Sequence, residues 1–148
     1  MNAIIHHLFY KIISIVMSIS VLFGGAGDCL KVDSGEWNTN YKYVLVHGLS
    51  GWGSYDKRYE KMPYWGMRGG DLIGFLNEKG FDSYAASVSP FGSAWDRACE
   101  LYAQLWGKKV DYGSSHSKTY GHDRFGRDYT GCSLIPDLTD DTKLVLIG

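Results

Sequence analysis

The residues with the clearest chemical potential lie in a glycine-rich turn that follows a short apolar segment. The segment is Tyr41–Val46, and the turn after it reads His47-Gly48-Leu49-Ser50-Gly51-Trp52-Gly53. Adjacent aromatic and β-branched residues of this kind are typical of a strand buried on both faces of a parallel sheet. In α/β proteins, ligands bind at the carboxyl ends of such strands. We therefore expect this turn to lie at a ligand site.

Two histidines, His116 and His122, lie in the polar segment 108–132. This segment is rich in glycine, tyrosine and charged residues, and it has no apolar period. It is too long for an ordinary connection, and segments of that length are either functional or disordered. Its many aromatic side chains favour order. We therefore interpret it as an ordered loop. From their residue types alone, both histidines would be interpreted as ordinary surface residues.

The elements that must position these residues follow from periodicity and capping signals. Strands alternating with helices predict a parallel sheet with flanking helices, which is an α/β fold. In the second helix, Ser93 is the expected N-cap, and the expected packing face contains Trp95, Ala98, Leu101, Tyr102 and Leu105. After Tyr41–Val46, the expected elements are a helix from Asp71 to a stop at Gly80, a strand over 81–88, a helix over 94–106, a helical turn over 134–141 and a buried strand over 142–147.

A search for a nucleophile motif gives a negative result. Hydrolases of the α/β class carry their serine in a strained G-x-S-x-G turn between a strand and a helix. The glycine–serine sequences around Ser50, Ser93 and Ser115 all fail this pattern. No catalytic triad can be assigned, and we expect His47 to orient its loop rather than to act as a base.

A series of short motifs nevertheless resembles one family, the secreted bacterial triacylglycerol lipases related to the staphylococcal and thermophilic bacillar enzymes. The resemblance covers residues 41–148, which correspond to only the N-terminal part of a family enzyme. It implies a zinc-containing α/β-hydrolase in which Gly148 begins the nucleophile turn and the serine, acid and base lie beyond it. The motifs are, in the family's order, HGLSGWG at 47–53, YWG at 64–66, SP at 89–90, AWDRACE at 94–100, VDYG at 110–113 and HDRFGR at 122–127.

The resemblance also implies the roles of four residues. It assigns Asp96, His116 and His122 as ligands of a structural zinc, whose fourth ligand, a downstream Asp, is absent from this chain. Carboxylate oxygens and imidazole nitrogens are suitable zinc ligands. Leu49 stands where the family has an aromatic residue whose backbone N–H stabilises the oxyanion, and a leucine can supply the same N–H. Calcium is a further possible cofactor of the complete enzyme.

Residues 1–28 have the order of a secretory signal peptide: a basic start, an apolar run and small residues before Asp28. The apolar run is shorter than the ~20 residues that a membrane span needs. An uncleaved anchor is the alternative. We expect a secreted lipase-like domain over 29–148. Its three cysteines, Cys29, Cys99 and Cys132, allow one disulfide with one thiol left over.

The expected function is hydrolysis of carboxylic esters, chiefly triacylglycerols, by the complete enzyme at a lipid–water interface, with this chain inactive alone. The net charge of −1 provides no basis for a nucleic-acid partner, and no protein partner is implied. The alternative is a non-catalytic secreted module that keeps the metal site. A domain adapted to stand alone should close its sheet, whereas this chain leaves the strand over 142–147 as an unpaired apolar edge. The unpaired edge favours part of a complete lipase over the non-catalytic module.

Overall fold

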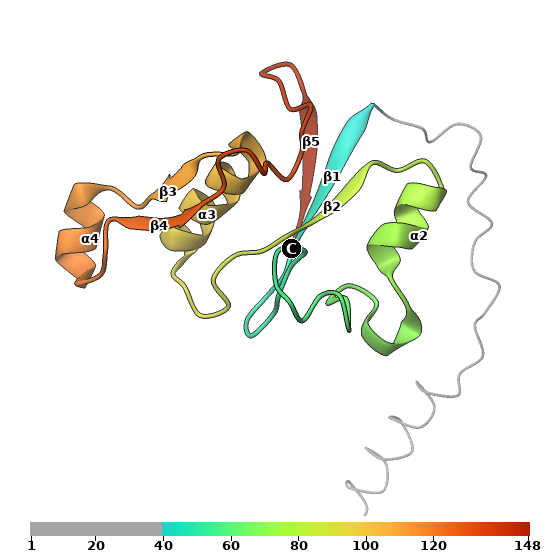
Figure 1. Cartoon of the computed structure of the whole chain (residues 1–148), viewed down its shortest axis with the longest axis horizontal. Coiled ribbons are helices and arrows are strands. Elements are labelled where there is room, and N and C mark those ends of the chain that lie inside the picture. The colour runs from blue at the N-terminus through green and yellow to red at the C-terminus, as the bar shows by residue number, and fades with distance from the viewer. Residues whose placement is uncertain (1–39) are drawn as a thin grey trace, which may run out of the picture. The chain divides into compact units, whose positions relative to one another are not determined.

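The computed structural model describes residues 40–148, and their centre is a three-stranded parallel sheet. The strands are β1 (Tyr41–Val46), β2 (Ser83–Ala86) and β5 (Lys143–Ile147), in the order β2-β1-β5. In register, Leu45 of β1 lies opposite Ala85 on one side and Ile147 on the other. Figure 1 shows these strands side by side. The predicted parallel α/β sheet is confirmed for the described residues.

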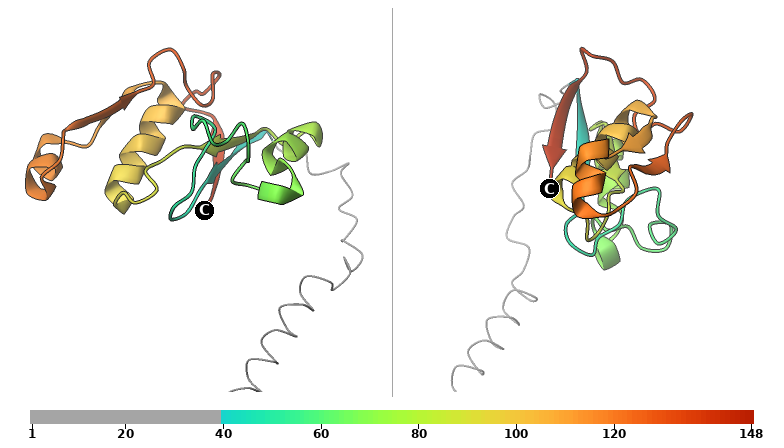
Figure 2. Two further views of the ribbon diagram at one scale, coloured as in Figure 1. Left: turned by 60° about the horizontal axis from the view of Figure 1, so that its bottom comes forward. Right: turned by 90° about the vertical axis from the view of Figure 1, so that its left-hand side faces the viewer.

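The core lies on both faces of β1. Val44 and Leu45 are buried, and because successive strand residues point to opposite faces, they pack in different clusters. Val44 packs with Leu105 of helix α3 (Ala94–Trp106), and Leu45 packs with Ile73 of helix α2 (Leu72–Glu78). The two helices lie on opposite sides of the sheet in Figures 1 and 2. The burial predicted for this strand on both faces is therefore confirmed.

Helix α2 begins and ends at the predicted signals. The side chain of Asp71 caps the helix by accepting a hydrogen bond from the N–H of Ile73 at 3.1 Å. Gly80 follows the helix with a φ of 84°, a left-handed conformation that glycine adopts without a Cβ clash. The short 3₁₀ helix η1 (Met67–Gly69) precedes it.

Helix α3 has the predicted bounds, and Ser93 forms a capping box with Asp96. Its predicted packing face was wrong for Trp95, Ala98 and Tyr102, which are exposed. The helix instead buries polar side chains together with apolar ones, because two of those polar groups hydrogen-bond the backbone that leaves β2. The buried residues are Glu100, Ala103, Gln104 and Leu105.

The segment 108–132 is ordered, as predicted, but the interpretation as a loop without secondary structure was wrong. It contains β3 (Lys109–Asp111), helix α4 (Ser114–Tyr120) and β4 (Phe125–Asp128), with β3 and β4 paired antiparallel. Val110 and Tyr129 are buried against Ala103 of α3. The segment therefore has its own small core, which its lack of apolar period concealed.

The last two predicted elements are partly corrected. Residues 134–141 form turns rather than a helical turn, with single hydrogen bonds such as Leu138 N–H to Ile135 C=O. Strand β5 is present, but it is not buried: the side chain of Leu146 is 57% exposed, and Leu144 and Ile147 are also exposed. Within the described sheet, β5 pairs only with β1 and is an edge strand.

The predicted signal peptide, 1–28, and Cys29 lie outside the described residues. Within the described part, Cys99 and Cys132 are both free thiols. No helix among residues 40–148 has the length and apolar character needed to cross a membrane.

Candidate functional site

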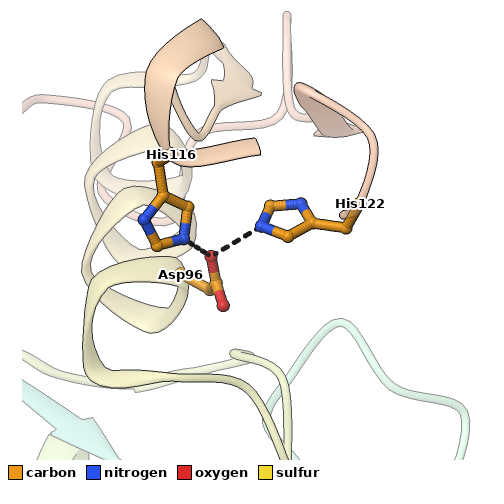
Figure 3. A group of neighbouring side chains, drawn as sticks. All are labelled: Asp96, His116 and His122. Carbon is orange, nitrogen blue, oxygen red and sulfur yellow. Dashed lines mark hydrogen bonds and ion pairs between the residues drawn. The ribbon is translucent and has the colours of Figure 1, made fainter. Parts of the chain in front are cut away.

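Three side chains from separate parts of the chain converge on one point (Figure 3). Asp96 lies in the first turn of α3, His116 lies in α4, and His122 follows α4. Nε2 of His116 is 3.0 Å from Oδ1 of Asp96, and Nε2 of His122 is 3.7 Å from the same oxygen. One ligand atom from each residue lies within 4.8 Å of the other two. The predicted convergence of these three residues is thus present.

The capping box of α3 fixes the orientation of the Asp96 carboxylate. Oδ2 accepts hydrogen bonds from the hydroxyl of Ser93 at 2.7 Å and from its N–H at 3.2 Å. Oδ1 is left to face the two histidines. A cap that the sequence predicted thus also aims the carboxylate, because the cap residue engages one carboxylate oxygen and leaves the other.

Neighbouring groups orient the two imidazoles. Nδ1 of His122 lies 2.8 Å from the carbonyl oxygen of Asp123, so this nitrogen carries the proton and donates, and Nε2 keeps its lone pair for a ligand. The His116 ring stacks on Trp95 at 5.6 Å between centroids, and Tyr112 contacts the His122 ring edge-on at 5.2 Å. Trp95, which lies outside the core, thus packs against the imidazole of His116.

The electrostatic environment favours the ionised form of Asp96. Burial is the largest single effect and would raise the pKa of this carboxyl. The hydrogen bonds from Ser93 and His116 together outweigh it, so that the pKa of Asp96 is lowered from its ordinary value. The carboxylate is therefore available as an anionic ligand.

The separations of the two imidazole nitrogens from Asp96 suit the shell of a small divalent cation. A tetrahedral shell with bonds of about 2.1 Å places neighbouring donor atoms roughly 3.4 Å apart, and the two separations from Asp96 are 3.0 and 3.7 Å. Two imidazoles and one carboxylate are a donor set that suits zinc. The residues present form a possible metal-binding triad.

The glycine-rich turn after β1 is closely packed and is attached to the segment that follows β2. His47 is fully buried; its Nε2 accepts from the N–H of Val88 at 3.3 Å, and its Nδ1 donates to the carbonyl of Gly48 at 2.9 Å. A Cβ on Gly51 would lie 2.5 Å from Nδ1 of His47. His47 thus packs beneath the turn as a buried, hydrogen-bonded side chain. A catalytic base would have to be accessible to the substrate, and His47 is not.

Leu49 lies at the tip of this turn, with its side chain 78% exposed. Ser50 follows with a φ of 58°, and its N–H donates to the carbonyl of Pro90 at 3.1 Å. Among the described residues, no acceptor contacts the Leu49 N–H. That amide is therefore free to donate to a ligand.

Sequence reasoning missed three residues that hold the site together: Arg97, Glu100 and Gln104. Each hydrogen-bonds the segment after β2. The available signal was their spacing, since positions i, i+3 and i+7 share one face of a helix. Polar residues at that spacing ordinarily mark the solvent face, and for this reason they were not recognised.

The fold is of the α/β class, with a parallel sheet, helices on both of its faces and a glycine-rich turn at the carboxyl end of the middle strand. The Asp-His-His cluster adds a possible metal-binding triad. Comparison with known proteins assigns the family. The family described as "Lipase-like, C-terminal domain" matches residues 39–148. The chain belongs to this lipase family.

Individual relatives agree with this assignment. A lipase of Staphylococcus epidermidis is 37% identical over 113 residues, which are 76% of this chain and 16% of the relative. EstA from Clostridium botulinum superposes with a TM-score of 0.63 at 42% identity, covering 73% of this chain and 24% of that protein. Staphylococcus hyicus lipase superposes with a TM-score of 0.61 at 34% identity, covering 73% and 28%. The chain thus spans about a sixth of the length of the curated relative.

Proposed function

We propose that this chain is the N-terminal part of a secreted lipase or esterase whose complete form hydrolyses carboxylic esters, chiefly triacylglycerols, at a lipid–water interface. The convergence of Asp96, His116 and His122 supports this proposal, because the resemblance to secreted lipases predicted that these three residues bind one metal ion, and the chain belongs to a lipase family. Membership of that family supports ester hydrolysis as the reaction class.

In this proposal, the turn after β1 provides one half of the oxyanion hole. The Leu49 N–H donates a hydrogen bond to the oxygen that becomes negatively charged during acyl transfer, and one such donor is worth roughly 10²- to 10³-fold in kcat. The second donor, the serine nucleophile, the acid and the base lie outside these 148 residues. The chain by itself therefore gives no ester turnover above background.

The metal in this proposal is a structural zinc held by Asp96, His116 and His122, and calcium belongs to the complete enzyme. When bound, zinc would cross-link α3 to the segment containing α4, and metal binding would contribute folding free energy to that segment. Asp96 supplies the anionic ligand, and the protonated Nδ1 of His122 keeps its Nε2 free to bind.

The alternative is a non-catalytic secreted module that binds metal through the same residues. A chimera separates the two: residues 40–148 replace the matching segment of S. hyicus lipase, with the unmodified lipase as the control. We expect the chimera to hydrolyse p-nitrophenyl esters. A folded, zinc-loaded chimera without turnover would favour the module.

The same chimera tests the oxyanion donor. Leu49→Pro removes the backbone N–H and should lower kcat by about 10²-fold, whereas Leu49→Ala keeps the N–H and should change kcat little. Equal losses in both variants would show that the side chain, and not the amide, supports the reaction.

A further inference from the structure

The side chain of Arg97 connects the two loops that leave the carboxyl ends of β1 and β2. Its Nη1 donates to the carbonyl oxygen of Ser89 at 2.8 Å, and its Nη2 donates to the carbonyl oxygen of His47. Arg97 lies in α3, one residue after Asp96. One guanidinium therefore holds a strand end and a neighbouring loop to the helix that also carries a metal ligand.

The next turns of α3 hold the second of these loops. The carboxylate of Glu100, which is 7% exposed, accepts from the N–H of Ser89 at 2.5 Å and from its hydroxyl at 2.6 Å. The amide of Gln104 accepts from the N–H of Ser87 at 2.9 Å. The backbone from Ser87 to Ser89 is consequently fixed to α3, and it provides a rigid base.

The glycine-rich turn is hydrogen-bonded to this segment and to the residue that follows it. The buried imidazole of His47 accepts from the N–H of Val88, and the N–H of Ser50 donates to the carbonyl of Pro90. Leu49 lies between these two attachments. The direction of the Leu49 N–H is thus set by two fixed points, the carbonyl of His47 on one side and Ser50 on the other. Arg97 is the residue of α3 that holds the His47 carbonyl.

We propose that Arg97 is a positioning residue for the turn at 47–53, holding the Leu49 amide in the orientation that an oxyanion donor requires. The use of that orientation in catalysis rests on the proposed function, whereas the ordering of the turn does not. A lysine cannot substitute fully, because the planar guanidinium presents two donors in a fixed fork and an ammonium is a point charge on a flexible stem.

The test measures amide hydrogen exchange in the 148-residue chain, in the presence of zinc, for the wild type and for Arg97→Ala and Arg97→Lys. Arg68, in the exposed helix η1, provides the matched control variants Arg68→Ala and Arg68→Lys. We expect Arg97→Ala to speed amide exchange at Ser50 and Gly51 about tenfold, because local opening is governed by local contacts. The exchange rates of the amides in α2 should stay unchanged. Arg97→Lys should have a smaller effect of the same kind.

Chemical rescue adds a measurement that a general loss of stability would not reproduce. Guanidinium at non-denaturing concentration should restore slow exchange at Ser50 and Gly51 in Arg97→Ala, with no effect on the Arg68 variants. Unchanged exchange in the turn of both Arg97 variants would overturn the proposal, as would an equal increase in the turn and in α2. Zinc affinity, measured on the same samples, reports separately on the proposed metal site.

Discussion

Nε2 of His116 lies 3.0 Å from Oδ1 of Asp96, although the two residues are 20 positions apart in the chain. The contact joins the first turn of α3 to α4, which belongs to a segment with a small core of its own. Because the opposite oxygen of the same carboxylate is held by Ser93, the site is connected to the start of the helix.

Loss of either histidine should abolish tight zinc binding. His116→Ala or His122→Ala leaves two ligands, and the affinity should fall by more than the roughly 10- to 100-fold typical of a change that only disturbs a ligand's orientation. Titration calorimetry at neutral pH measures this. Asp123→Asn is the matched control, because Asp123 contacts His122 only through its backbone carbonyl. A histidine variant with wild-type affinity would refute the assignment.

Ser93→Ala should weaken both the helix and the metal site. The variant loses the hydroxyl that caps α3, which costs about 1 kcal/mol of unfolding free energy. It also removes the shorter of the two hydrogen bonds that hold Oδ2 of Asp96 and leaves only the one from the backbone N–H. Urea unfolding with and without zinc measures both effects, with the larger loss expected when zinc is present. Ser115→Ala, at an exposed position of α4, serves as the control. An identical loss with and without zinc would show that the cap does not orient the ligand.

Gly53→Ala should destabilise the domain, whereas Gly69→Ala should not. A Cβ on Gly53 would lie 2.1 Å from the backbone oxygen of Ala86, while a Cβ on Gly69 would have no neighbour within 4 Å. Overpacking of this kind costs about 1–3 kcal/mol, and the backbone of β2 cannot move without disturbing its pairing. Unfolding free energies of the two variants provide the measurement. Equal stabilities would show that the turn is not packed against β2.

The Asp111–Arg124 pair should contribute stability that is lost in acid. The two side chains form hydrogen bonds of 2.8 and 2.7 Å, and those bonds, with one from the Gly113 N–H, lower the pKa of Asp111 to about 2. A lowered folded-state pKa means that the contribution is present above the ordinary value of 3.8 and disappears as the pH falls toward about 2.

Arg124→Gln should therefore flatten the fall of unfolding free energy between about pH 4 and pH 2, measured without metal. The effect should be small, because both groups are exposed and water screens their attraction. Arg68→Gln, which changes the net charge equally, is the control. If both variants kept the wild-type slope, the pair would contribute nothing to stability.

Local signals in the sequence determined much of the architecture. The apolar run of β1, the caps at Asp71 and Ser93 and the stop at Gly80 each depend on neighbours within a few positions, so these elements lie where the pattern predicted them. The three members of the possible metal-binding triad could also be predicted from the sequence, through motifs that resemble a known family.

Tertiary structure alone decided which side chains of α3 and β5 became buried and which distant groups met. The polar face of α3 is buried because backbone donors and acceptors after β2 need partners there, and a buried polar group is stable only when such partners arrive from elsewhere in the fold. Likewise, β3 pairs with β4 and β5 remains exposed because of the neighbours that the fold places beside them. The sequence contains Asp96, His116 and His122 at widely separated positions, but only the packing of the 108–132 segment on α3 brought one possible ligand atom of each within 4.8 Å of the other two. Such convergence depends on contacts between distant segments, which no local pattern records.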